Sequence, residues 1–384
     1  MVYGVNPTPI SETTSEFDSS QSMKESDLEL LTTVDTDKLS SLKSDQTNLY
    51  YYEKLSEEEK KLYSEILYII QNLQEEVVIS SLDDKQIDKV FNYVQNDHPE
   101  IFYVEGFSCT KYMVAGQLKK ISFTGKYTKT KDEVIDLNER VNTYVDSFVE
   151  ELKNNLEDQL DDYSVIKYVY DYIITNTEYD INSAENQNIL SVMFYKKSVC
   201  QGYAKTAQLL LNSLGIDCTM VVGTAKEGEP HAWNLVMADG DYYYMDVTWG
   251  DASYNISADN IELINSVPPV NYEYLLVNED TISINHTFDD IEIMPDCTSM
   301  DDNYYIKEGL YFTELLPDKL KEVFENAYAK DLDYITIKMN DENTYLEIWN
   351  YLLEEQNVFN YLKDLKSVSY AENKELLYMV FWIK

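Results

Sequence analysis

The chain has 384 residues and a formal net charge of −40 at pH 7, with 70 acidic against 30 basic residues. This acidic excess argues against nucleic acid and anionic membrane surfaces as partners and favours neutral or basic peptides. Hydrophobic residues make up 44% of the chain and aromatic residues 13%, which predicts mostly globular structure, and no run of about 18 apolar residues that could span a membrane occurs.

Two segments are predicted before the middle of the chain. Residues 1–48 are rich in serine, threonine and acidic residues with few aromatic ones, which predicts a disordered acidic tether. Residues 49–158 predict a small α+β module, in which Ser56 and Glu59 form a capping box at the start of a helix. The further elements expected there are a helix around 87–94, strands over 101–107 and 112–127, and a helix over 132–156.

Residues 159–294 predict a central domain that contains the residue types best suited to chemistry. A helix over 162–175 comes first. Apolar residues at helical spacing then follow Cys200 up to Gly215, so the thiol is expected at a helix N-terminus. Unpaired backbone N–H groups and the helix dipole at that position favour the thiolate form. A strand over 216–222 follows.

A β-hairpin with an Asp-Gly turn is predicted next. If its loop has two residues, Ala238 pairs with Asp241 and Trp233 lies opposite Asp246. His231 and Asp246 would then share one face of the hairpin as diagonal neighbours within side-chain reach. A loop with an odd number of residues would place them on opposite faces.

The C-terminal residues 295–384 predict a further α+β domain with an accessory binding or packing role, because no suggestive cluster of catalytic residue types occurs in them. The expected elements are strands over 304–312, 334–339 and 376–383 and helices over 317–329 and 344–355.

Cys200, His231 and Asp246 are together the parts of an activated cysteine nucleophile: a thiol, a base that takes its proton, and a carboxylate that orients the base. Cys218 lies in a strand-like apolar run and reads as a core residue. No Cys-x-x-Cys or His-x-x-x-His spacing occurs, so we expect no metal site and no cofactor. The four cysteines also lack the paired spacing of a disulfide framework.

Three segments carry this constellation: Val199-Cys200-Gln201-Gly202-Tyr203-Ala204, His231-Ala232-Trp233-Asn234 and Asp246-Val247-Thr248-Trp249. Together they resemble the transglutaminase-like superfamily of papain-type cysteine enzymes, in particular its bacterial branch. The resemblance implies an α+β fold in which the helix carrying the cysteine packs on an antiparallel sheet carrying the histidine and the aspartate, flanked by smaller α+β modules. It also implies that Cys200 is the nucleophile, His231 the general base and acid, and Asp246 the orienting residue.

The resemblance extends over roughly residues 160–290. Gln187 occupies about the place of a glutamine near the oxyanion site in such proteins. The stretch 271–276, with His286 after it, also looks like the bacterial branch, and for His286 a position beside the site and a plain packing role both stay open. The chain departs from that branch at Tyr170, where related sequences carry a histidine.

Gln201, Trp233 and Trp249 are expected along the substrate groove. The alternative for the two tryptophans is that they bury the hairpin against the helix of Cys200.

Two functions remain open. The first is an enzyme that acylates Cys200 with a peptide or isopeptide carbonyl of a peptide or protein substrate, and then passes the acyl group to water or, less favoured, to an amine. The second is a non-catalytic interaction module; retention of all three catalytic residue types favours the enzyme. No basic-then-apolar signal peptide opens the sequence, which favours the cytoplasm, or the cell exterior if an upstream signal was removed. Oligomeric state is left open.

Overall fold

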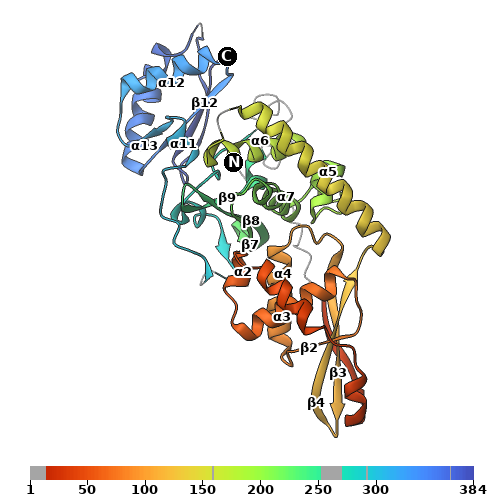
Figure 1. Ribbon diagram of the computed structural model, residues 1–384. Helices are drawn as coiled ribbons and strands as arrows, with labels where there is room; N and C mark the ends of the chain where they lie inside the picture. Colours follow the sequence, from red (N-terminus) through yellow and green to blue (C-terminus); the bar gives the residue numbers. More distant parts are fainter. Residues whose placement is uncertain (1–13, 158–159, 252–269, 291–292, 364) are drawn as a thin grey trace.

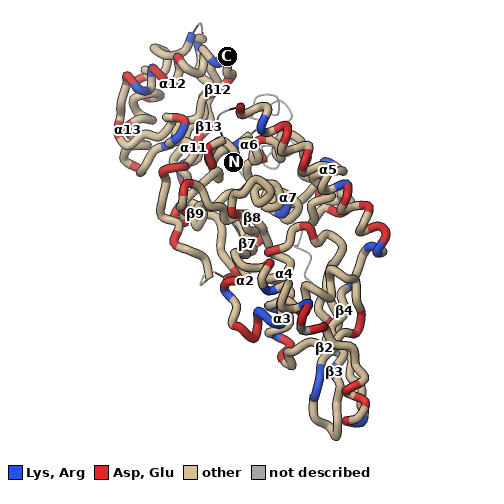
Figure 2. Tube along the Cα trace, in the orientation of Figure 1, with Lys and Arg blue, Asp and Glu red and all other residues tan. Residues whose placement is uncertain are grey.

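The computed structural model describes residues 14–157, 160–251, 270–290, 293–363 and 365–384. They form an N-terminal, a central and a C-terminal part that follow one another along an elongated molecule (Figure 1). Acidic residues occur along the trace of all three parts (Figure 2). None of the described helices is long and apolar enough to cross a membrane.

The N-terminal part combines helices with a four-stranded sheet in the order β1-β3-β4-β2. The capping box predicted from Ser56 and Glu59 is present at the start of α3. The strands are β1 (Thr14–Ser22), β2 (Val77–Ile79), β3 (Val104–Val114) and β4 (Gln117–Tyr127), and the α-helices are α1 (Thr36–Asp45), α2 (Tyr50–Glu53), α3 (Glu57–Gln71) and α4 (Asp84–Asp97).

Residues 14–48 form secondary structure, so the prediction of a disordered tether is wrong for them, while residues 1–13 lie outside the described part. Strand β1 pairs in parallel with β3, and Phe17 packs edge-on against Phe107 with ring centroids 5.4 Å apart. Low apolar content shows only that a segment cannot build a core of its own. It does not prevent that segment from adding to the edge of an existing sheet, where backbone hydrogen bonds hold it.

The central part is built on an antiparallel sheet with the order β10-β7-β8-β9, on which helix α7 packs. Helix α6 packs on α7, and the long helix α5 runs along the outside (Figure 1). The elements are α5 (Lys131–Leu156), α6 (Asp162–Asn176), β5 (Glu178–Tyr179), β6 (Lys197–Ser198), α7 (Cys200–Ser213), β7 (Cys218–Ala225), β8 (Glu229–Ala238), β9 (Asp241–Met245), α8 (Val247–Gly250), α10 (Glu279–Ile282) and β10 (Thr287–Phe288). A helix carrying the cysteine therefore packs on an antiparallel sheet, in an α+β fold.

The hairpin of β8 and β9 has the register predicted for a two-residue loop, because Ala238 pairs with Asp241. Asp239 and Gly240 both have positive φ, of 48° and 93°, as a tight turn matching the strand twist requires. This register fixes the face on which each side chain of β8 lies. Trp233 clusters with β9 and later segments, whereas Ala232 clusters with Cys200 of α7.

The C-terminal part has its own core and a sheet in the order β11-β12-β14-β13. Its elements are α11 (Tyr304–Lys307), β11 (Tyr311–Phe312), α12 (Pro317–Ala329), β12 (Tyr334–Met339), α13 (Glu342–Trp349), β13 (Ser369–Asn373) and β14 (Tyr378–Trp382). The strand predicted over 304–312 is wrong at its start, where α11 forms instead. Asn303 caps this helix, and Tyr304 stacks on Tyr272 with ring centroids 3.9 Å apart, contacts that the apolar run alone does not reveal.

Residues just after the predicted boundary at 295 pack on the central part. Cys297 is buried in one cluster with Trp233. The Asn303 side-chain amide donates to the carbonyl oxygen of Leu276 at 3.2 Å, and the Tyr243 and Ser299 hydroxyls lie 2.8 Å apart. The C-terminal sheet itself begins only with β11.

Candidate active site

Cys200 is the first residue of α7 and only 4% exposed, at the helix N-terminus that the sequence predicts. The first turn of α7 lies very close to the preceding segment. A Cβ on Gly202 would lie 2.1 Å from the Ser198 hydroxyl and 2.6 Å from that of Ser191. The two serine hydroxyls are themselves 2.6 Å apart. Glycine at 202 therefore allows the close approach that fixes where the helix, and with it the thiol, begins.

Asp246 connects the residues around the base. His231 Nε2 donates to Asp246 Oδ2 at 2.7 Å, and His286 Nε2 donates to the same oxygen at 3.0 Å. The backbone N–H groups of Thr248 and Trp249 donate to Oδ1 at 2.9 and 3.0 Å, so Asp246 also caps α8. These four bonds restrain a fully buried carboxylate. Because Nε2 of His231 is bonded to this carboxylate, Nδ1 is the ring nitrogen that is left for another partner.

Burial and charge act in opposite directions on the three titratable groups. Burial by itself lowers the pKa of His231, but the Asp246 carboxylate, with a further contribution from Cys200, raises this pKa to about 10. Burial by itself raises the pKa of Asp246, but His231 and His286 outweigh it and hold the pKa well below the usual range. Burial lowers the pKa of His286, which favours its neutral form. The arrangement therefore favours a protonated His231 beside an ionised Asp246.

His286 is the residue of this cluster for which the sequence left two readings open. It follows α10 and lies 40 positions after Asp246 in the chain, and its Nδ1 lies 3.2 Å from the carbonyl oxygen of Ile282. The sequence feature that pointed to His286 is the stretch 271–276 before it, which resembles the bacterial branch of the superfamily.

The structure separates the two tryptophans: Trp233 is fully buried, whereas the prediction that Trp249 lies along a substrate groove stays open. Trp233 is fully buried beneath the histidines, with ring centroids 4.9 Å from His286 and 5.2 Å from Phe288, so it cannot wall an open groove. It is also not packed against α7, because it belongs to the opposite cluster. Trp249 is half-buried and packs on His286 and Tyr274. The alternation along β8 fixes the face of Trp233, but only later segments decide that this face is covered.

Tyr170 supports the turn after Asp246. Its hydroxyl donates to the carbonyl oxygen of Asn271 at 2.7 Å and lies 3.3 Å from the backbone oxygen of Asp246. A Cβ on Gly250 would lie 2.0 Å from this hydroxyl. The tyrosine thus fills space that only glycine leaves free.

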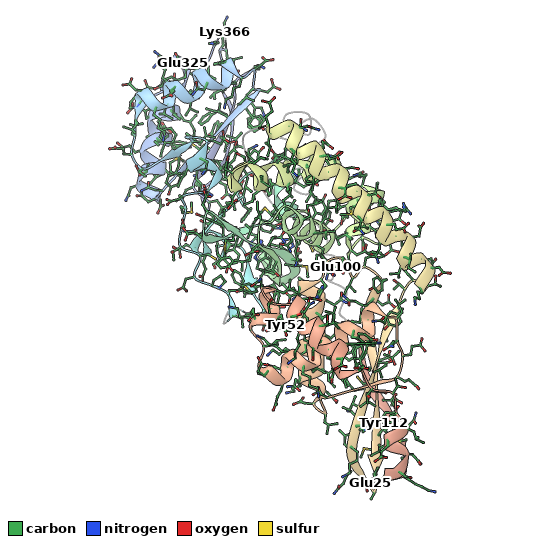
Figure 3. The ribbon with its side chains drawn as sticks, in the orientation of Figure 1. Glu25, Tyr52, Glu100, Tyr112, Glu325 and Lys366 are labelled. Atoms are coloured by element: carbon green, nitrogen blue, oxygen red, sulfur yellow. The ribbon has the colours of Figure 1, made fainter. Side chains whose placement is uncertain are left out.

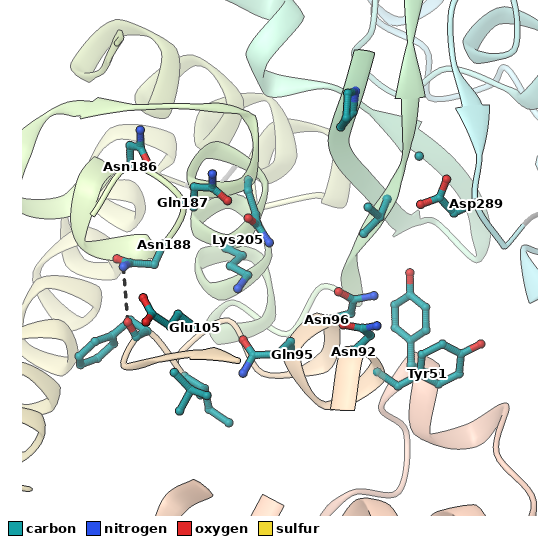
Figure 4. A pocket seen from close by; sticks show the side chains of 18 of the residues that line it. Tyr51, Asn92, Gln95, Asn96, Glu105, Asn186, Gln187, Asn188, Lys205 and Asp289 are labelled. Atoms are coloured by element: carbon teal, nitrogen blue, oxygen red, sulfur yellow. Dashed lines mark hydrogen bonds between the residues drawn. The ribbon is translucent and has the colours of Figure 1, made fainter. Parts of the chain in front are cut away.

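A cavity of about 580 Å³ lies between the N-terminal and central parts (Figure 4). Cys200 and His231 do not line it, but their chain neighbours Gln201 and Pro230 do. Gln187 also lines it, so the structure brings two of the sequence-predicted residues to one cavity. The other polar lining residues include Asn92, Gln95 and Glu105 from the N-terminal part and Lys205 from α7. The sequence assigned no site residue to the N-terminal part, because the approach of α4 to α7 is a tertiary contact.

His231, Asp246 and His286 are also a set that could in principle hold a metal ion, since one ligand atom from each lies within 4.8 Å of the others. The same atoms, however, form the two short hydrogen bonds that join the histidines to Asp246. An ion bound there would have to replace both bonds. The geometry fits hydrogen-bonded histidines better than metal ligands.

The chain spans only part of the length of the known proteins to which it is similar. Residues 150–247 match the model of the Transglutaminase-like superfamily. Kyphoscoliosis peptidase of Mus musculus is 26% identical over 111 residues, which cover 25% of this chain and 17% of the length of the mouse protein. A crystal structure of a TGase is similar over 38% of this chain and 44% of its own, with 21% identity and a TM-score of 0.26. A candidate cysteine protease from Cytophaga hutchinsonii is similar over 36% and 61%, with 15% identity and a TM-score of 0.24.

The family match covers the helix of Cys200 and the hairpin of His231 and Asp246. This chain therefore carries a domain of the transglutaminase-like superfamily, which includes cysteine proteases and transglutaminases.

Proposed function

We propose that this protein is a cysteine-nucleophile enzyme that cleaves peptide or isopeptide amide bonds through a thioester on Cys200. The observation that carries the proposal is the restraint on Asp246: four hydrogen bonds hold a buried carboxylate that in turn orients His231. A histidine held in this way, with Cys200 contributing to its raised pKa, is suited to exchange a proton with the thiol.

In the proposed reaction the Cys200 sulfur, as the thiolate, attacks the substrate carbonyl carbon. Protonated His231 gives its proton to the leaving nitrogen as the C–N bond breaks, which releases an amine and leaves the thioester. His231 then takes a proton from water as the water oxygen attacks the thioester carbon. The C–S bond breaks, a carboxylic acid leaves, and the proton on His231 restores the starting pair.

The N-terminus of α7 also supplies a place for the charge that develops on the substrate oxygen. N–H groups in the first turn of a helix have no intrahelical acceptor, and Cys200 is at the first position. Gln187 lines the adjoining cavity and is proposed as a further donor to this oxygen. Hydrolysis is proposed as the main reaction, with transfer of the acyl group to an amine as the alternative.

A labelling experiment tests the activated thiol. Iodoacetamide should modify Cys200 selectively, as read by peptide mapping, and labelling should fall in His231→Ala. Cys109 and Cys297 are internal controls, because burial raises their pKa values to about 12 and about 11. Equal or absent labelling of Cys200 would instead support a non-catalytic interaction module.

A turnover assay then separates hydrolysis from transfer. Quenched peptides incubated with and without a primary amine should yield the free acid in both cases. Predominant amide product in the presence of the amine would assign the protein to acyl transfer.

A further inference from the structure

Lys205 places a cation inside an otherwise acidic cavity. It is 5% exposed and is the only basic residue among the described residues that line the cavity, whereas Glu105, Glu185 and Asp289 are acidic. Figure 4 shows its side chain extending from α7 into the space between the two parts. No hydrogen bond or ion pair joins its ammonium group to any residue that the structure describes.

The nearest candidate for a structural partner is otherwise engaged. Glu100 lies where the N-terminal and central parts meet (Figure 3) and acts on Lys205 electrostatically. It is bonded to His98, however, with 2.7 Å between Nδ1 and the carboxylate. Burial dominates at Lys205 and lowers its pKa to about 8. A buried amine without a close counter-ion is costly unless a ligand supplies one.

Two amides beside Lys205 also lack partners. Gln95 of α4 is 8% exposed, and its Nε2 is buried without a hydrogen bond. Gln201 lies one helical turn before Lys205 on α7, and its Oε1 is likewise buried without a partner. All three side chains line the same cavity. Buried polar groups are normally satisfied, so these atoms lack something that a bound molecule can provide.

We propose that Lys205, Gln95 and Gln201 form a subsite for a carboxylate-bearing residue of the peptide substrate. Lys205 and the Gln95 amide donate to the carboxylate, and the Gln201 oxygen accepts a backbone N–H of the same peptide. Gln201 follows the nucleophile directly and Lys205 lies about 6 Å further along the helix, so the recognised residue is close to the reacting carbonyl. The inference rests on the proposed function, since it names the substrate that this site takes.

The test measures protection of Cys200 from iodoacetamide by two sets of blocked alanine pentapeptides, in which one glutamate or one glutamine is moved through the five positions. At one position glutamate should protect at about tenfold lower concentration than glutamine, as charge-assisted hydrogen bonds allow. The acidic protein as a whole repels a glutamate peptide, so this preference reports a local cation. In Lys205→Met the ratio of the protecting concentrations of the glutamine and glutamate peptides should fall to near one. Lys205→Arg should retain a preference for glutamate.

Controls separate folding and function from the subsite. Lys153→Met removes one exposed charge from α5 and should keep the ratio. Thermal unfolding checks the fold of Lys205→Met, and Gln95→Leu should lower the ratio by an independent route. Equal protection by both peptide sets in the wild type, or a preference that persists in Lys205→Met, overturns the subsite. Because protection needs no turnover, that outcome is distinct from failure of the proposed function, which appears as unselective labelling of Cys200.

Discussion

At the residue scale, the organising group is a single carboxylate. Asp246 has no exposed surface, and both of its oxygens are bonded, one to two histidines and one to two backbone amides. An ionised group so deeply buried is tolerated only when its bonds replace the lost hydration. The consequence for His231 is a fixed ring orientation and a raised pKa.

The proposed triad should behave as a unit. We expect Cys200→Ala and His231→Ala each to lower kcat by about 10⁴-fold or more, and the double variant to lose little more, because both residues act in the same step. Asp246→Ala should retain more activity, since Asp246 orients the base and does not react. Single-turnover and steady-state rates on one peptide check this. Full activity of Cys200→Ala would contradict the mechanism.

The pH dependence follows from the histidine. Pairing with Asp246 raises the pKa of His231 to about 10, above the value of about 6.5 for a histidine in an unfolded chain. The stability gained from this pairing is therefore fully present below about pH 6.5 and is lost as the pH rises through about 10. The alkaline limb of kcat/KM should therefore lie far above 6.5. In Asp246→Asn the carboxylate that raises the pKa of His231 is gone, so burial lowers this pKa and the alkaline limb of kcat/KM should move to lower pH. A limb at the same pH in both proteins would show that Asp246 does not set it.

His286 should act as a positioning residue for Asp246. His286→Phe keeps an aromatic ring between Trp233 and Trp249 but removes one hydrogen bond to the carboxylate. Loss of a bond to a charged group should lower kcat by about 10- to 100-fold with little change in KM, and should shift the alkaline limb. Tyr274→Phe is the control, because Tyr274 packs on His286 while its hydroxyl bonds Asn285. Equal effects of His286→Phe and Tyr274→Phe on kcat would show that His286 contributes only packing and does not position Asp246.

At the element scale, the start of α7 depends on the absence of a side chain at one position. Gly202→Ala would place a Cβ within 2.1 Å of the Ser198 hydroxyl, so the helix or the serine must shift. We expect a loss of about 1–3 kcal/mol in the free energy of unfolding and slower alkylation of Cys200. Denaturant unfolding and iodoacetamide kinetics measure the two effects. Adding Ser198→Gly should recover part of both; unchanged stability of Gly202→Ala would refute the close packing.

At the scale of the whole molecule, contacts between the central and C-terminal parts show that the domain boundary lies later than residue 295. Residues 297–308 pack on the central part even though they follow the predicted boundary at 295. Cys297 is buried beside Trp233, and Asn303 bonds the backbone of Leu276. Tyr163 of α6 also donates to Glu308 at 3.0 Å. The segment closes the face of the sheet on which the histidines lie.

Two truncations should therefore differ. A chain ending at residue 309 should unfold at a higher temperature and remain more soluble than one ending at 294, because it keeps the cover over Trp233 and Leu276. Both should expose apolar surface that the C-terminal domain normally covers. Thermal unfolding and alkylation of Cys200 compare them. Equal stability of the two truncated chains would show that residues 295–309 contribute nothing to the central core.

The sequence by itself determined the local geometry of the candidate site. Helical spacing up to Gly215 placed Cys200 at a helix N-terminus, and the Asp-Gly turn set the register that brings His231 and Asp246 together. These features could be read because turns and hydrophobic periods act over a few neighbouring residues.

Only the tertiary structure decided the rest. Tertiary contacts bring His286 to Asp246, bury Trp233 and add β1 to the edge of a sheet. They also form the cavity that Gln95 of α4 and Lys205 of α7 both line. Each of these joins segments far apart in the chain. Contacts of this kind leave no periodic pattern in either segment, because each segment satisfies its own local preferences equally well without the other.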